Sequence, residues 1–188
     1  ISAYLPDFNE MYHNTKILPT VLSRLERTGV VTKEQSLEIG AVGMAARASG
    51  LCRDIRKSHP YGFFKNYEYN PVLKHHGDVY SRFQLRKDEI IKSIEVIKTL
   101  TDKVPNPSND LDFKPKPNTF AISLIEGWRG EICHCAITDQ NGELIKYKIK
   151  DPSLHNWMTL ALSVRRNEIS DFPICNKSFN LSYCGHDL

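Results

Sequence analysis

Hydrophobic residues recur every three or four positions along much of this chain, which is the spacing that places them on one face of a helix. The clearest stripe of this kind runs over about 78–102, where the charged residues fall mostly on the other faces. Three further helices are expected, at about 17–28, 33–57 and 153–166. These long helices are expected to pack together.

Capping residues mark the expected ends of the helices. Gly29 stands where the C-terminal cap of the first helix belongs. Thr32 and Gln35 form a capping box, in which the hydroxyl accepts from a backbone N–H and the amide reaches back. Asp151, followed by a proline, is typical of an N-cap. Asn167 suits a left-handed C-cap after two arginines that complement the helix dipole.

An alternating pattern with turn residues predicts β-structure in the last third of the chain. Strand-like segments cover 119–125, 131–138 and 144–149. The sequence Asp-Gln-Asn-Gly at 139–142 is a strong turn signal between the last two. A small antiparallel hairpin element is therefore expected.

The fold class that follows is α+β and mainly helical. We expect one domain over 1–188, with a helical part at 1–104, a proline-rich linker at 105–118, and a β-hairpin with the C-terminal helix at 119–188. The tail from 170 onward is expected to be irregular or a short strand.

Composition excludes several classes of protein. Of the 188 residues, 40% are hydrophobic and 25% are charged, which is ordinary for a globular protein. The net charge of +3 is too mild to imply nucleic acid as a partner. No apolar run approaches the roughly 20 residues that a membrane span needs. The chain begins at Ile1 rather than Met, which is typical of a piece of a longer protein.

Five cysteines do not make a disulfide framework, because the count is odd and the density is low in a chain of this size, so reduced thiols in a cytoplasmic compartment are expected. Cys133 and Cys135 share one face of a strand while His134 points to the other, which does not clamp one metal easily. Cys175 and Cys184 lack the spacing of a zinc site. No glycine-rich phosphate loop and no nucleophile elbow is present, so the motifs do not support nucleotide binding.

Two arginine-bearing segments are candidates for chemistry. Arg47, Asp54 and Arg56 lie within ten residues of one another beside glycines, and they fit either a solvated charged face or a cavity. Arg129 sits in a glycine-flanked turn that begins at Glu126, where a fixed guanidinium can face a cleft.

A series of dispersed motifs occurs in a fixed order across nearly the whole chain. They are Val42-Gly43, Arg47-Ala48-Ser49-Gly50, Asp54-Ile55-Arg56, Pro60-Tyr61, Gly77-Asp78-Val79-Tyr80-Ser81-Arg82-Phe83, Glu126-Gly127-Trp128-Arg129-Gly130-Glu131, Asp151-Pro152, Asn156-Trp157 and Asp171-Phe172-Pro173. This series resembles the large subunit of membrane-bound, energy-converting nickel–iron hydrogenases and the homologous 49-kDa-type subunit of respiratory complex I. The resemblance implies that the chain is about the C-terminal half of such a subunit.

The resemblance also implies where a nickel–iron centre would be held. Ser182 and Gly185 occupy the two positions of the late cysteine pair, and Cys184 is one residue out of place. A serine hydroxyl is a poor ligand where soft thiolates are needed, and glycine offers no side chain. We therefore expect no metal in this chain, with a quinone as a possible acceptor. Two alternatives remain: a hydrogenase with altered ligation through Cys184, and a noncatalytic scaffold subunit.

By position, the resemblance assigns catalytic roles to Arg129, which matches the arginine above the metal site, and to Glu126, which opens the same motif. It assigns cavity or scaffold roles to a second set: Arg47, Asp54, Arg56, Ser182, Cys184 and Asp187.

The function implied by the resemblance is that of an oxidoreductase subunit. It would transfer electrons in a membrane-associated NADH dehydrogenase-like or formate hydrogenlyase-like complex, as a peripheral protein on the inner, cytoplasmic face. Its partners would be an iron–sulfur small subunit, which carries the cluster, and other subunits, with no nucleic acid. The isolated fragment is expected to be inactive and to self-associate through apolar surface.

Overall fold

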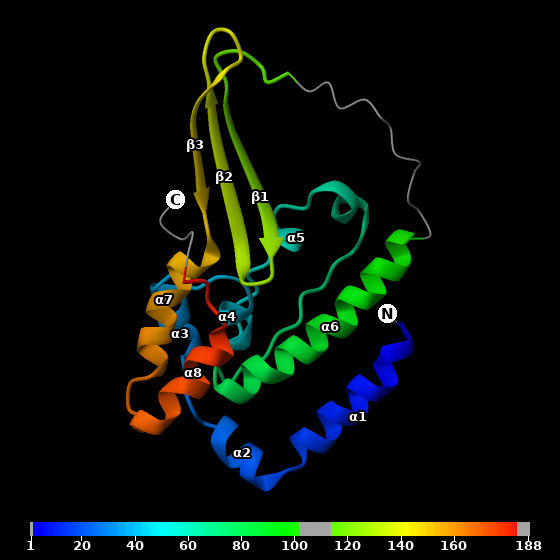
Figure 1. Cartoon of the computed structure of the whole chain (residues 1–188), viewed down its shortest axis with the longest axis vertical. Coiled ribbons are helices and arrows are strands. Elements are labelled where there is room, and N and C mark those ends of the chain that lie inside the picture. Colours follow the sequence, from blue (N-terminus) through cyan, green and yellow to red (C-terminus); the bar gives the residue numbers. More distant parts are fainter. Residues whose placement is uncertain (1, 102–113, 184–188) are drawn as a thin grey trace.

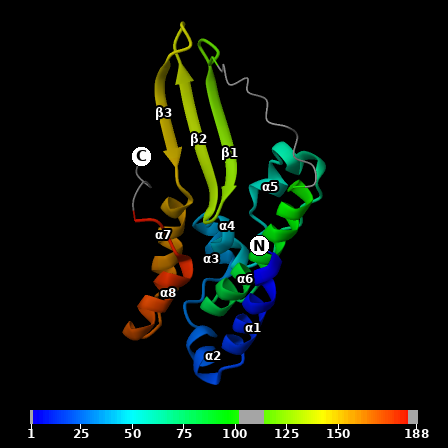
Figure 2. The same ribbon diagram turned by 45° about the vertical axis from the view of Figure 1, so that its right-hand side comes forward.

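The computed structural model describes residues 2–101 and 114–183 (Figure 1). Its helices are α1 (Leu5–Lys16), α2 (Pro19–Leu25), α3 (Lys33–Glu38), α4 (Gly43–Ala48), α5 (Ile55–Ser58), α6 (Val79–Thr101), α7 (Pro152–Ser163) and α8 (Phe172–Phe179), with 3₁₀ turns at Ser2–Tyr4, Gly62–Asn66 and Ile169–Asp171. The strands are β1 (Phe120–Gly127), β2 (Gly130–Thr138) and β3 (Leu144–Lys150). Helices form the body of the molecule, and the sheet rises from it in both views (Figures 1 and 2). The α+β fold class is confirmed.

Several local predictions are confirmed. Helix α6 matches the long amphipathic stripe, and α7 begins one residue before the predicted final helix and ends three residues before its predicted end. The capping box forms, because Gln35 N donates to Thr32 Oγ1 at 3.2 Å and Thr32 N donates to Gln35 Oε1 at 3.0 Å. The Asp151 carboxylate accepts from Ser153 N at 2.7 Å and so begins α7.

The single helix predicted over 33–57 is wrong. The segment forms three short helices instead, α3, α4 and α5, separated by breaks near two glycines. Gly40 and Gly50 adopt φ angles of +68° and +86°, which a right-handed helix cannot contain. The first helix is also shorter than predicted, because Arg27 takes a left-handed φ of +60° after α2 has ended.

Two other predictions are corrected in the C-terminal part of the chain, and one helix was not predicted. Arg166, not Asn167, takes the left-handed conformation after α7, with a φ of +61°. Asn167 instead caps the helix through its side chain, donating from Nδ2 to Ser163 O at 2.7 Å. The tail is helical rather than irregular over 169–179, where α8 buries Cys175 and Phe179 one turn apart. Helix α1 has no counterpart among the predicted helices; it runs beside α6 in both views, with the Tyr12 ring stacked on Phe83.

The sheet has the antiparallel order β1-β2-β3, which confirms the predicted hairpin element. The β1–β2 register ends with Glu126 opposite Glu131 and Gly127 opposite Gly130. This register places Arg129 in the tight turn between the two strands. In both views that end of the sheet meets the helical body (Figures 1 and 2).

The main core lies where α4, α6, α7 and α8 meet. It contains these buried side chains: Leu25, Val31, Ala45, Val79, Leu160, Cys175, Phe179 and Leu181. At its upper edge the start of α4 touches the β1–β2 turn so closely that a Cβ on Gly43 would lie 2.2 Å from Gly130 Cα. This contact fixes the turn that carries Arg129. Among the described helices, none has the length and apolar character that crossing a membrane requires.

Candidate functional site

Arg47 is the centre of a buried ion cluster. Its side chain is only 2% exposed, and three carboxylates surround its guanidinium. Nη1 lies 3.1 Å from Asp54 Oδ2 and 2.9 Å from Glu126 Oε1, and Nη2 lies 3.2 Å from Glu89 Oε1. The cluster therefore joins α4, the N-cap of α5, the middle of α6 and the end of β1.

Arg56 supplies the second cation of the cluster. Its Nη2 lies 2.6 Å from Asp54 Oδ2 and 3.3 Å from Glu89 Oε2. Its guanidinium carbon also stacks 4.2 Å from the centre of the buried Tyr69 ring. Both carboxylates shared by the two arginines are thereby held on two sides, which stiffens the whole arrangement.

Glu126 ties the sheet to this cluster through both of its oxygens. While Oε1 meets Arg47, Oε2 accepts a hydrogen bond from Ile55 N at 3.0 Å. The carboxylate thus links the end of β1 to the first residue of α5, which contacts β1 directly. Loss of this side chain would remove one of the three carboxylates around Arg47 and leave Ile55 N without its acceptor.

The cluster carries a formal excess of negative charge, because two arginines face three carboxylates. Burial raises the pKa of Glu126, and Asp54 adds to the rise, while Arg47 opposes it. Burial disfavours the charged form of Arg47, but Glu89, Glu126 and Asp54 outweigh it and raise the pKa of the guanidinium. Both arginines stay charged, so Glu126 is the member suited to take up a proton.

A cavity of about 240 Å³ opens onto the cluster. Arg47, Arg56, Glu89 and Glu126 line it on the polar side, and Met44 and Trp128 contribute apolar surface. Within the described part of the chain, Arg47 Nε and Glu89 Oε1 are buried without a hydrogen bond. Both atoms are closed off from solvent, and Glu89 Oε1 keeps its ion pair with Arg47 Nη2 at 3.2 Å, so the cavity is charged on the side of the cluster.

Arg129, in the β1–β2 turn, faces away from the ion cluster and toward α8. Its Nε donates to the backbone carbonyl of Asn180, just beyond α8. Asn156, which is 1% exposed, holds the turn from below, with Nδ2 donating to Arg129 O at 3.2 Å and Oδ1 accepting from Val42 N at 3.1 Å. One buried amide therefore joins α7, the start of α4 and the arginine turn.

The space around Arg129 is small and strongly cationic. A cavity of about 10 Å³, close to the volume of one water, is lined by Arg82, Arg86 and Arg129 together with Asn156 and residues of α8. Burial, with a contribution from Arg129, lowers the pKa of Arg86 to about 10. Burial also lowers the pKa of Arg82 to about 9, with the nearby Arg86 contributing to the decrease. These groups still carry their charge at neutral pH, which leaves a region suited to stabilising negative charge.

The structure brings together four of the residues singled out by sequence, and separates the others. Arg47, Asp54, Arg56 and Glu126 form the ion cluster, whereas Arg129 faces Asn180 and a different cavity. Ser182 is half-buried, and its backbone N–H donates to Ser153 Oγ at 3.0 Å. Cys184 and Asp187 lie outside the described residues.

Sequence reasoning missed Glu89, Tyr69 and the role of Asn156. Glu89 lies on a long charged helix, where nothing local distinguishes it from the exposed carboxylates of the same helix. Asn156 belongs to the Asn156-Trp157 motif of the series, and its place in that motif is the sequence feature that could have indicated a role for it. The packing of α6 against α4 is what makes Glu89 a partner of Arg47.

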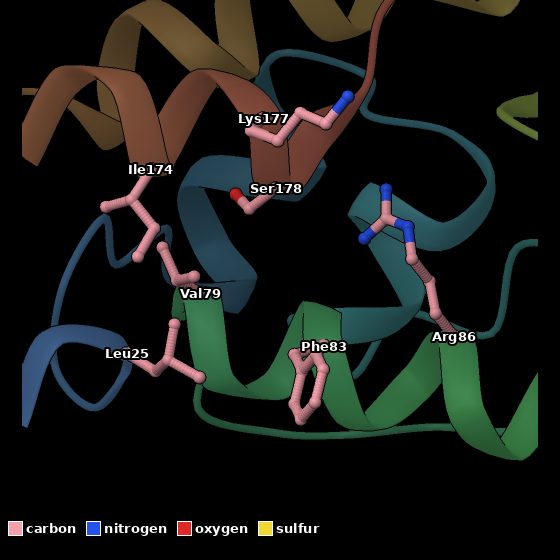
Figure 3. A pocket seen from close by; sticks show the side chains of 7 residues that line it. All are labelled: Leu25, Val79, Phe83, Arg86, Ile174, Lys177 and Ser178. Atoms are coloured by element: carbon pink, nitrogen blue, oxygen red, sulfur yellow. The ribbon is translucent and has the colours of Figure 1, made fainter. Parts of the chain in front are cut away.

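A third cavity, of about 210 Å³, is mainly apolar and lies between α2, α6 and α8 (Figure 3). Leu25, Val79, Phe83 and Ile174 form its apolar part, and Arg86 stands at the other end of the view beyond Phe83. This cavity shares Arg86 with the cationic region around Arg129.

The described residues do not cluster potential metal ligands. The described residues contain no group of three or more His, Cys, Asp or Glu side chains arranged to hold a metal. Ser182 presents a hydroxyl where a soft metal needs a thiolate. Among the described residues, position 182 therefore offers no thiolate.

The motifs that resemble hydrogenase-related oxidoreductases lie on a hairpin turn carrying an arginine, on the buried ion cluster and on the helical core beneath them. The family described as "Respiratory-chain NADH dehydrogenase, 49 Kd subunit" matches residues 1–119. The chain belongs to this family.

Curated relatives agree with the assignment. An NADH-quinone oxidoreductase subunit of Herpetosiphon aurantiacus is 28% identical over 185 residues, covering 95% of this chain and 49% of the relative. Another NADH-quinone oxidoreductase subunit, from Phocaeicola vulgatus, is 30% identical over 152 residues, covering 79% of this chain and 29% of the relative. The carbon monoxide-induced hydrogenase of Rhodospirillum rubrum is 29% identical over 163 residues, covering 86% of this chain and 45% of the relative. The chain thus spans about half the length, or less, of these relatives.

Proposed function

We propose that this chain works within an electron-transferring oxidoreductase subunit of a membrane-associated, NADH dehydrogenase-like complex, without a nickel–iron centre of its own. Two relatives are named as NADH-quinone oxidoreductase subunits, which supports a complex of this kind and a quinone as acceptor. An iron–sulfur small subunit would then deliver the electrons, and the protein would lie peripherally at the membrane.

The braced turn of Arg129 is the observation that carries the proposal. The backbone of the turn is fixed by Asn156 and by its contact with Gly43, and the arginine side chain is fixed by Asn180 O. A guanidinium held this firmly keeps its orientation as charge develops beside it, which is the condition for electrostatic stabilisation of a reduced acceptor.

Glu126 has a complementary role in this proposal. Reduction of a quinone to a quinol takes up two protons along with two electrons, so a group that can hold a proton beside the reaction region is required. Glu126 is the candidate because burial raises its pKa and because it lines a cavity of about 240 Å³ that shares Met44 with the separate cavity of Arg129. The remaining carboxylates of the cluster keep the arginines charged while Glu126 exchanges its proton.

Replacement of Arg129 by Met in the intact complex tests the proposal. We expect the complex to assemble, with the rate of quinone reduction falling at least tenfold, because Met retains the packing volume but not the charge. Lys146→Met, on the exposed face of β3, is the matched control and should leave the rate unchanged. Full turnover with the Arg129 variant would instead support a noncatalytic scaffold subunit.

A hydrogenase with altered ligation is the second candidate, and the likeness to the carbon monoxide-induced hydrogenase favours it. Elemental analysis of the intact complex distinguishes the two. Nickel near one per large subunit, with hydrogen evolution lost on Cys184→Ser, would support the hydrogenase. Iron without nickel would support the proposal.

A further inference from the structure

A polar hollow of about 350 Å³ lies on a part of the molecule that the proposed function does not use. It forms where the loop after α2 and the start of α3 meet the C-terminal end of α7. Its walls include three arginines, Arg27, Arg165 and Arg166. It shares no lining residue with the ion cluster or with the cavities around Arg129.

The hollow is cationic without any internal neutralisation. Neither Asp nor Glu is among the residues that line it. Among the ion pairs formed by the described residues, none includes Arg27, Arg165 or Arg166. All three arginines are exposed and line the same hollow, so their like charges favour an anion there.

The arginines are not needed to cap α7. Asn167 Nδ2 already donates to the carbonyls of Ser163 and Arg165, at 2.7 and 3.0 Å. The backbone N–H groups of Val164 and Arg165 take two further carbonyls of the last turn, those of Leu160 and Leu162. Three of the last four carbonyls of α7 thus have partners that are not arginine side chains, and among the described residues no hydrogen bond at this helix end uses a guanidinium group.

Two of the three arginines occupy costly backbone conformations. Arg27 and Arg166 have φ angles of +60° and +61°, in the left-handed region that non-glycine residues rarely adopt. Their positions are held by side chains: Asp78 Oδ2 accepts from Arg27 N at 3.0 Å, and Asn167 Oδ1 accepts from Gly29 N at 3.1 Å. Asn167 thereby joins the two arginine-bearing segments, although 138 residues separate it from Gly29.

The remaining lining suits an organic molecule. Gln35 uses Oε1 to accept from Thr32 N, so its Nε2 is left as a further donor beside the arginines. Val30 and Leu162 add apolar surface to the same hollow. Guanidinium groups match phosphate oxygens in geometry and charge, and the apolar side chains match a ring or a carbon chain.

We propose that this hollow binds a small organic phosphate, with the phosphate groups held by Arg27, Arg165 and Arg166 and the organic part placed over Val30 and Leu162. The site does not depend on the proposed electron transfer. It also differs from a glycine-rich phosphate loop, because side chains from two distant segments, rather than successive backbone N–H groups, supply the donors.

Calorimetric titration of the intact complex with ADP, at low salt, tests this proposal. Adenosine and inorganic phosphate are the comparison ligands. We expect ADP to bind about tenfold tighter than inorganic phosphate, adenosine to show no measurable binding, and the affinity for ADP to fall as salt rises. Adenosine binding as tightly as ADP, or no binding of ADP, would overturn the proposal.

The variants Arg27→Asn and Arg166→Asn remove charge while keeping a residue that tolerates the left-handed backbone. Each should weaken ADP binding about tenfold, and the double variant about a hundredfold. Arg24→Gln is the matched control, because Arg24 lies nearby but bonds Ser170 O and pairs with Asp171 outside the hollow. Unchanged ADP affinity in the double variant, with an unfolding temperature equal to that of the wild type, would contradict the proposal.

Discussion

The Arg47 guanidinium lies 2.9 Å from the Glu126 carboxylate, although 79 residues separate the two along the chain. This contact joins the short helix α4 to the end of β1 and, through Glu126 Oε2, to the start of α5. The position of the arginine turn therefore depends on an ion cluster that no single segment contains.

Removal of the Arg47 cation is expected to destabilise the fold strongly. Arg47→Met leaves three carboxylates buried around an uncharged side chain, and this should lower the free energy of unfolding by about 3–5 kcal/mol. Urea unfolding of the full-length protein measures the change. The control is Arg24→Ala, which breaks a half-exposed pair and should cost about 1 kcal/mol or less. Equal losses in the two variants would contradict this account of the cluster.

The raised pKa of Glu126 predicts a specific pH dependence. A carboxyl whose pKa is higher in the folded state binds more protons there, so its stabilising contribution is present at low pH and lost as pH rises through the folded pKa. Glu126→Gln removes this titration. The wild type should therefore lose stability relative to the variant as the pH rises above 4.5, by up to about 1.4 kcal/mol per pH unit.

Urea unfolding of the full-length wild type and the Glu126→Gln variant, from about pH 4 to about pH 7, provides the measurement. The difference between their free energies of unfolding is the informative quantity, because groups common to both proteins cancel. A difference that stays constant, or that moves in favour of the wild type with rising pH, would show that burial does not dominate at Glu126.

The contact between Gly43 and Gly130 predicts a strong effect of one methyl group. Gly43→Ala places a Cβ 2.2 Å from Gly130 Cα at a φ of +59°, so the turn must move; we expect a loss of about 2–4 kcal/mol. Gly40→Ala is the matched control, with a φ of +68° but open space around the new Cβ, and should cost about 1 kcal/mol. Thermal unfolding of the full-length protein compares the two variants, and similar losses would show that the close approach is unimportant.

Asn156 is expected to control both stability and the position of the arginine turn. Asn156→Ala leaves Val42 N and the carbonyl of Arg129 without their buried partner, which should cost about 2–3 kcal/mol. Leu154→Ala, at an exposed position of the same helix, should change stability by less than about 0.5 kcal/mol. In the intact complex, the Asn156 variant should also lower the rate of quinone reduction. A full rate at reduced stability would limit Asn156 to a structural role.

Short-range sequence patterns were sufficient to predict α6, the hairpin and the helix caps at Thr32 and Asp151. Each depends on residues within a few positions of one another: a repeating apolar stripe, a turn sequence between alternating segments, or a side chain that bonds the next turn of backbone. The helix predicted over 33–57 failed for the opposite reason. Its glycines could not be assigned as breaks or as close contacts without knowing that Gly43 meets Gly130 and that α6 packs against α4.

The sequence alone was enough to determine the α+β class, the long helix, the hairpin and the motif series that indicates the family. Hydrophobic periodicity, turn residues and the order of motifs can each be recognised without knowing which segments meet in space. Only the tertiary structure decided which charges meet. Glu89 joins Arg47, Arg129 turns toward Asn180 rather than Glu126, and Arg27 approaches Arg165 and Arg166, because burial and ion pairing depend on separations in space that residue spacing does not encode.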